Sequence, residues 1–347
     1  MKKFILPFLI AQALSFNAFA DNDKSNNDNN DRDENSQVED LHAPKDNLIV
    51  SHFWANDFTP RKASAALTPA TANMTFHGGN VMSAVNTTLI FWGKSWSNKT
   101  FISDKVAGLN SLYGNFDSST YAGTVSEYLP TPLIHKLVQQ KTDFSTSASN
   151  NPNNVLSEVC KVVGSANIDP NGYYPVYTDV KRGSAGYCAY HSAGTCGGKP
   201  LQFAFFFNLD GDAGCDPQSS FALPRNDVNA QKPGYVLAGS TSTKAESQGL
   251  AALASVTAHE LAETITDPVA FPVTSSAFWG GWYDSLGAEN GDKCAWTFGP
   301  STVDATKPGT VSLGGIPWKL QGEWSNAAQT AGTGYLSNGL TGCLSGS

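Results

Sequence analysis

The composition of this chain changes after residue 47, through a transitional segment that ends at residue 73, and this change limits which part can form a core. Residues 21–47 contain nine acidic and three basic residues, many asparagines and almost nothing apolar. Such a segment cannot bury enough apolar surface to offset the entropy that it loses on ordering. We therefore interpret residues 21–73 as a disordered acidic leader or pro-segment with a linker. Residues 74–347 are then one large globular domain.

The first twenty residues have the pattern of a signal peptide. Lys2 and Lys3 precede the mostly apolar run 4–16, and Ala18-Phe19-Ala20 has the small-x-small form of a cleavage site. We expect residues 1–20 to be removed and the protein to be secreted, as a monomer. No later stretch approaches the ~20 apolar residues that a membrane helix needs. No basic stripe indicates a nucleic-acid partner.

Six cysteines fit an exported protein, because an even number predicts up to three disulfides. Their pairing is left open by the sequence. Cys188 and Cys196 could close a local loop, and Cys343 could fasten the C-terminal region. A thiolate metal site is the alternative, but the chain has no CxxC pair to support it.

Hydrophobic patterning predicts an α+β fold: a single large domain with a mixed sheet, a few helices and long loops rich in Gly, Pro and Ser, stabilised by disulfides. The strand predictions are 87–92 and 201–208, with weaker ones at 173–180 and 235–239. The helix predictions are 103–113, 124–140 (interrupted by Pro130 and Pro132) and 244–266. Residues 48–54 are apolar but lie within the predicted linker.

The segment 248–268 carries the chemistry of most interest. Its apolar residues recur at three- and four-residue steps and predict a helix with one apolar face, which Asp267-Pro268 should end. His259 and Glu263 lie four positions apart, so their side chains can converge on one ion. Glu260 takes the position of the general base in HExxH metalloproteases, where it activates water on the metal.

A carboxylate is an acceptable zinc ligand, so His259 and Glu263 predict a zinc site, with calcium as the other cation to consider. A catalytic zinc needs a third ligand from another element, and the Gly-rich segment 281–294 offers three carboxylates. We favour Glu289 as that ligand, with Asp292 and Asp284 as alternatives. Asp267 lies too far along the helix, so we interpret it as a supporting or capping group.

Other interpretations of these motifs stay open. His259, Glu260 and Glu263 could belong to a solvated surface helix. The segment 208–216 alternates Asp and Gly and could chelate calcium, although a polar turn fits its spacing better. Cys188 and His191 could form a protease dyad, but Cys188 fits a disulfide better. His77 fits a turn.

The chain resembles the EXORDIUM / phosphate-induced protein 1 family over about residues 75–343. Three segments carry the resemblance: 76–82 with 89–96 (FHGGNVM and LIFWGKSW), 187–191 (YCAYH), and 226–228 with 251–268. Plant members are extracellular, linked to growth, and have no His-Glu-x-x-Glu helix. Microbial relatives look more similar, with His-Glu-Leu-x-Glu-x-x-Thr-Asp-Pro followed by Gly-Trp-x-Asp and Glu-x-Gly-Asp-x-Cys. The resemblance implies the fold, but it does not imply the plant function.

Two functions follow from these observations. The first is a secreted zinc hydrolase, most simply a peptidase, with metal ligands His259, Glu263 and Glu289 and with Glu260 as base. Its substrate would be an extracellular peptide, a protein or a cell-wall glycan. The second is a non-catalytic extracellular or cell-surface protein that binds glycans or a partner and holds a structural metal or none. Exposed aromatic side chains would suit glycan binding, although core packing is the ordinary explanation for a high aromatic content.

Overall fold

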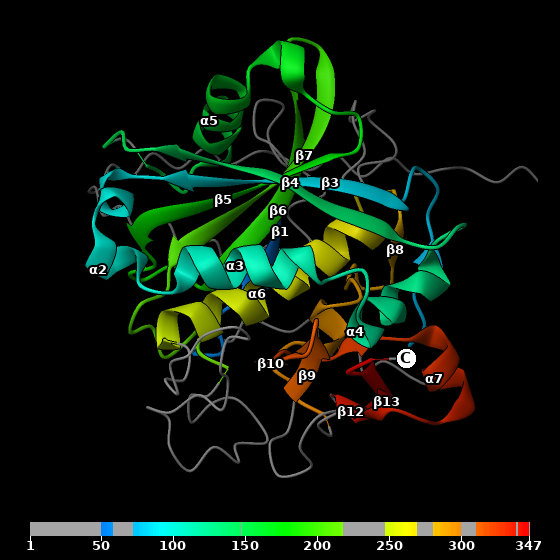
Figure 1. Ribbon diagram of the computed structural model, residues 1–347. Coiled ribbons are helices and arrows are strands. Elements are labelled where there is room, and N and C mark those ends of the chain that lie inside the picture. The colour runs from blue at the N-terminus through cyan, green and yellow to red at the C-terminus, as the bar shows by residue number, and fades with distance from the viewer. Residues whose placement is uncertain are drawn as a thin grey trace, which may run out of the picture. The chain divides into compact units, whose positions relative to one another are not determined.

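The computed structural model describes residues 50–57, 72–146, 148–217, 247–268, 280–299, 310–337 and 339–346. The chain divides into two compact units, Met1–Asp33 and Glu34–Ser347, and all described residues belong to the second unit. A mixed six-stranded sheet with helices packed against it dominates this unit (Figure 1). The predicted α+β class is therefore confirmed. No helix within the described ranges has the length and apolarity that crossing a membrane requires.

The main sheet has the strand order β1-β6-β7-β5-β3-β4. Strands β3, β4, β5 and β7 are parallel, whereas β6 runs antiparallel to both β7 and β1. Parallel strands that are covered on both faces have continuous apolar sequences, and this explains why 87–92 and 201–208 predicted buried strands. The bounds are β1 Val50–Trp54, β3 Ala84–Trp92, β4 Ile134–Asp143, β5 Gly172–Lys181, β6 Tyr187–Cys196 and β7 Lys199–Asn208.

Helices cover both faces of this sheet. Figure 1 shows α5 (Pro152–Val163) on one face, with α3 (Lys105–Gly114) and α6 (Gln248–Thr266) on the other. Helix α6 contacts β6 and β7, and it also contacts α3 and β10 (Ile316–Lys319). It is buried on all sides from its second residue onward, so the prediction of a single apolar face was wrong. The polar side chains of α6 consequently need partners inside the protein.

The ends of α6 have identifiable causes. The Ser247 hydroxyl accepts the Leu250 N–H at 3.2 Å, and Ser247 itself donates to the Asp104 carboxylate. The helix ends at Thr266, directly before Asp267-Pro268, as predicted. The first three residues of the predicted helix, 244–246, lie outside the described residues.

One prediction on the secondary structure needs correction. The predicted helix 124–140 is wrong: a short 3-10 helix, η4 (Thr124–Tyr128), is followed by β4. Pro130 and Pro132 end the helical turn, and the chain continues as an edge strand. The predicted helix 103–113 matches α3 closely. The weak strand prediction at 235–239 lies outside the described residues.

Strand β1 belongs to the core, although the sequence placed it in the linker. It pairs with β6, and Phe53 has no exposed surface. The domain boundary at residue 74 therefore excludes one strand of the sheet. The apolar stretch 48–54 was the signal for this strand, and its separation from the other apolar segments concealed the pairing.

Three disulfides fasten the fold, as expected: Cys160–Cys196, Cys188–Cys215 and Cys294–Cys343. A Cys188–Cys196 loop is ruled out because these residues lie near opposite ends of the extended strand β6, about 26 Å apart at ~3.3 Å per residue. Cys343 does fasten the C-terminal region, through Cys294.

The remaining elements are short. The other strands are β2 Thr75–Phe76, β8 Trp282–Tyr283, β9 Thr310–Leu313, β11 Glu323–Trp324, β12 Tyr335–Ser337 and β13 Leu340–Leu344. The other helices are α2 Lys99–Ile102, α4 Thr120–Gly123 and α7 Asn326–Ala331, with 3-10 turns η3 Lys94–Ser97, η5 Ser165–Asn167 and η6 Asp292–Cys294.

Candidate metal centre

Helix α6 places three of the predicted site residues inside the protein. The side chains of His259, Glu260 and Glu263 have no exposed surface. One helical turn separates His259 from Glu263, and the His259 Nε2 atom lies 3.0 Å from Glu263 Oε1. The alternative of a solvated surface helix is therefore ruled out.

The segment 280–299 brings two acidic residues to the helix. The Asp292 N–H donates to Glu263 Oε1 at 2.9 Å, and the Asp292 carboxylate lies 3.8 Å from His259 Nε2. Glu289 is 2% exposed and also lies in this region. Gly291, between these two acids, approaches the helix so closely that a Cβ there would lie 2.6 Å from His259 Nδ1. Only glycine fits at this point without displacing the imidazole.

His191, on β6, completes the cluster. Its Nδ1 atom lies 3.2 Å from Glu260 Oε2 and 3.7 Å from Glu263 Oε2, and its Nε2 atom lies 3.6 Å from Glu289 Oε2. From its sequence position His191 was expected only as a possible partner of Cys188, but Cys188 forms a disulfide with Cys215. The sequence feature that could have indicated His191 is the single histidine in segment 187–191, one of the segments that resemble the EXORDIUM family.

Strand β1 and Gln321 surround the cluster. The Phe53 ring stacks on His259 with 4.1 Å between centroids, and the Phe53 backbone N–H bonds the Glu260 carboxylate. The Ser51 side chain hydrogen-bonds Glu289. The Gln321 side-chain nitrogen lies 2.6 Å from His259 Nδ1 and donates to the Gly291 carbonyl. These contacts hold both the imidazole and the carboxylates in place.

Burial dominates the electrostatics of the cluster. It raises the pKa of Glu263 to about 8, and burial together with the Glu263 charge raises the pKa of Asp292 to about 8. Burial also raises the pKa values of Glu260 and Glu289 well above their usual range, with further repulsion from Glu263. Burial lowers the pKa of His259 to about 4 and that of His191 to about 3. These side chains therefore favour their neutral forms unless a cation is nearby.

The cluster has the chemistry of a metal site. Buried atoms without a hydrogen-bond partner include Nε2 of both histidines and one carboxylate oxygen each of Glu260, Glu263 and Glu289. Imidazole nitrogens and carboxylate oxygens are the ligands that zinc and related divalent metals take. Two sets of three residues are close enough to hold an ion: His191, Glu263 and Glu289, and His259, Glu263 and Asp292. The predicted set His259, Glu263 and Glu289 is thus divided between these two groups.

The other predicted candidates have different partners. Asp284 accepts a hydrogen bond from Lys293 at 2.7 Å, and both side chains are buried. The Asp267 N–H donates to the Glu263 carbonyl at the end of α6, whereas its buried carboxylate has no hydrogen-bond partner, and burial together with the Glu263 charge raises its pKa. Asp210 and Asp212 pair with Lys105 and Arg182, which favours a polar turn over a calcium loop at 208–216. His77 contacts Thr75 and the Tyr283 carbonyl, again in a turn.

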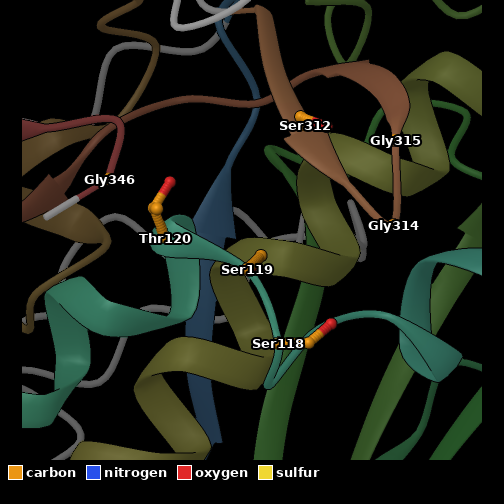
Figure 2. Close-up of a pocket in the computed structure, with 7 residues that line it drawn as sticks. All are labelled: Ser118, Ser119, Thr120, Ser312, Gly314, Gly315 and Gly346. Carbon is orange, nitrogen blue, oxygen red and sulfur yellow. The ribbon is translucent and has the colours of Figure 1, made fainter.

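A pocket elsewhere on this unit lacks such groups. Figure 2 shows it between the α4 region and the turn that joins β9 to β10. Its lining contains no carboxylate, imidazole or thiol side chain, so it is no candidate for metal chemistry. The lining residues are Ser118, Ser119, Thr120, Ser312, Gly314, Gly315 and Gly346.

Comparison with models of known protein families, with curated proteins and with solved structures found no match for this chain. The resemblance to the EXORDIUM family therefore stays a prediction. The function has to be argued from the buried cluster itself.

Proposed function

We propose that this protein is a secreted metal-dependent hydrolase, and specifically a zinc peptidase. One observation carries the proposal: two histidines and four acidic residues from three separate elements meet inside the protein, with unpartnered nitrogen and oxygen atoms facing one another. Burying so many ionisable groups is costly unless a cation compensates them. The six residues are His191, His259, Glu260, Glu263, Glu289 and Asp292.

The candidate ligands and the candidate base are different residues. Glu263 would hold the ion together with His259 and Asp292, or together with His191 and Glu289. A bound zinc ion would polarise a scissile carbonyl and make water more acidic. Glu260 belongs to neither set of three residues, and its Oε1 atom has no hydrogen-bond partner. Its carboxylate is therefore available to accept a proton, as a general base requires.

The test combines elemental analysis with one substitution. We expect the mature protein, purified from zinc-replete medium, to contain zinc and to cleave members of a peptide library. Glu260→Gln should keep the metal and lower hydrolysis by about 100- to 10,000-fold, the usual contribution of a general base. Glu158→Gln is the matched control, because Glu158 is a buried acid outside the cluster. Folded protein without metal, or a fully active Glu260→Gln variant, would contradict the proposal.

The complete burial of the histidines favours a second candidate, a non-catalytic extracellular protein with a structural cation. In that case metal removal lowers the unfolding temperature, and no peptide or glycan library is turned over. If glycans are hydrolysed and this activity depends on Glu260, the hydrolase proposal stands, but its substrate is a glycan and not a peptide.

A further inference from the structure

The histidine nitrogens and carboxylate oxygens that could bind a cation form two groups and do not converge on one point. Glu263 Oε1 lies 3.0 Å from His259 Nε2, whereas Glu263 Oε2 faces His191, 3.7 Å from its Nδ1 atom. The two sets of residues that could hold an ion have only Glu263 in common. One carboxylate thus presents a different oxygen to each set.

Both histidines are contacted at one ring nitrogen and leave the other without a hydrogen-bond partner. Each is contacted at Nδ1, His191 by Glu260 at 3.2 Å and His259 by Gln321 at 2.6 Å. Each presents a buried Nε2 atom that has no hydrogen-bond partner. The Nε2 atom of His191 lies 3.6 Å from Glu289, and that of His259 lies 3.8 Å from Asp292. The Glu260 carboxylate can accept a proton from His191 Nδ1, as is typical for metal-binding histidines, whereas the Gln321 amide nitrogen at His259 Nδ1 is a donor.

Charge balance also favours two ions. Ionised Glu260, Glu263, Glu289 and Asp292 carry four negative charges. In the described part of the chain, the two histidines are the basic side chains that lie within 4.0 Å of these carboxylates. With one divalent ion, two of these buried carboxyl groups would favour their protonated forms, whereas two divalent ions would allow all four to be ionised.

We propose that the cluster binds two divalent cations, one between His191, Glu263 and Glu289 and one between His259, Glu263 and Asp292, with Glu263 as the bridge. This inference rests on the proposed metal centre and specifies its composition. In hydrolases with two metals, ions about 3.5–4 Å apart contact both the attacking and the leaving oxygen. Mixed imidazole and carboxylate ligands suit zinc or manganese.

The proposal assigns roles to two residues that contact the histidines. Glu260 Oε2 positions His191, while its Oε1 atom remains the free oxygen for proton transfer. A cation on His259 Nε2 places the ring proton on Nδ1. The Gln321 amide nitrogen cannot accept that proton, so a cation on Nε2 requires the Gln321 side chain to move away from Nδ1 and to give up its present bonds to Gly291 and Trp296.

The first test is the stoichiometry. The full mature protein is stripped with a chelator, titrated with zinc and measured by elemental analysis after removal of free metal. We expect two zinc ions per chain. A single zinc ion would overturn the two-cation proposal and leave the proposed hydrolase intact, whereas protein that binds none would overturn both.

The second test reports the distance between the ions. Protein loaded with manganese should give an electron paramagnetic resonance spectrum with spin coupling between two ions. His191→Ala and His259→Ala should each bind one ion and show the six-line spectrum of isolated manganese, and Glu158→Gln should keep two coupled ions. Uncoupled spectra in the wild-type protein would contradict a shared Glu263. If circular dichroism shows that a histidine variant does not fold, the spin coupling in the wild-type spectrum still decides whether two ions share Glu263.

Discussion

Gly291 shows how one residue controls the geometry of the centre. It lies between Glu289 and Asp292, where the loop backbone approaches His259 and Glu263 so closely that no side chain fits between them. A Cβ at this position would be 2.6 Å from His259 Nδ1 and 2.9 Å from Glu263 Oε1. Neither neighbour is a flexible surface side chain, because both are fully buried.

We therefore expect Gly291→Ala to displace ligands more than it unfolds the protein. Zinc affinity should fall by roughly 10- to 100-fold, the range seen when groups that orient metal ligands are changed. Competition with a chromophoric chelator measures this affinity. Gly114→Ala is the control, because nothing lies within 4 Å of a Cβ there. Unchanged affinity in Gly291→Ala would show that the loop and the imidazole are not in contact.

The sequence predicted elements best where the pattern was local. Continuous apolar runs identified β3 and β7, and periodicity with Asp267-Pro268 identified α6 and its end. Glu263 and its neighbours could be proposed because helical spacing converts directly into proximity. His191 could not be found in this way, since its approach to α6 depends on the pairing order of distant strands. The core position of β1 was missed for the same reason.

The contact between α5 and β4 predicts a pH dependence. Glu158 on α5 is 4% exposed, and burial with the nearby Asp143 carboxylate raises its pKa to about 7. The folded state thus holds this proton more tightly than the unfolded state, whose pKa is near 4.5. The stabilising contribution is complete below pH 4.5 and is lost as the pH rises to about 7. Asp143, whose pKa Lys161 lowers to about 2, has finished titrating below this window.

Glu158→Gln should remove this dependence. Relative to the wild-type protein, the variant should gain about 1–3 kcal/mol of unfolding free energy between about pH 5 and pH 8. Urea unfolding at the two pH values gives the unfolding free energy of each protein. Subtracting the wild-type value from that of the variant removes the contribution of the buried cluster, which titrates in both proteins. If the unfolding free energies of variant and wild-type protein differ by the same amount at both pH values, Glu158 is ionised throughout this range and the prediction is wrong.

At the scale of the whole molecule, the centre combines segments that are far apart in the sequence. Ser51 and Phe53 contact it from β1, His191 from β6, and Gln321 from the region after β10. The loop with Glu289 and Asp292 runs into Cys294, which is bonded to Cys343. This disulfide connects the loop that carries Glu289 and Asp292 to the C-terminal strand β13.

Replacing Cys294 and Cys343 by alanine should therefore affect both stability and metal binding. We expect a loss of about 2–5 kcal/mol of unfolding free energy, typical for a native disulfide, and weaker zinc retention because the loop is released. The control replaces Cys160 and Cys196, which join α5 to the far end of β6. That variant should lose stability but keep zinc when folded. Equal loss of zinc in both variants would show that the effect is general unfolding.

The link from Cys294 to Cys343 also has a consequence for timing. Residues 51 and 343 must both be in place before the centre is complete, so a growing chain cannot assemble it early. If the centre has the hydrolase activity proposed above, that activity could appear only after these distant segments have come together and metal has bound, and so not during synthesis.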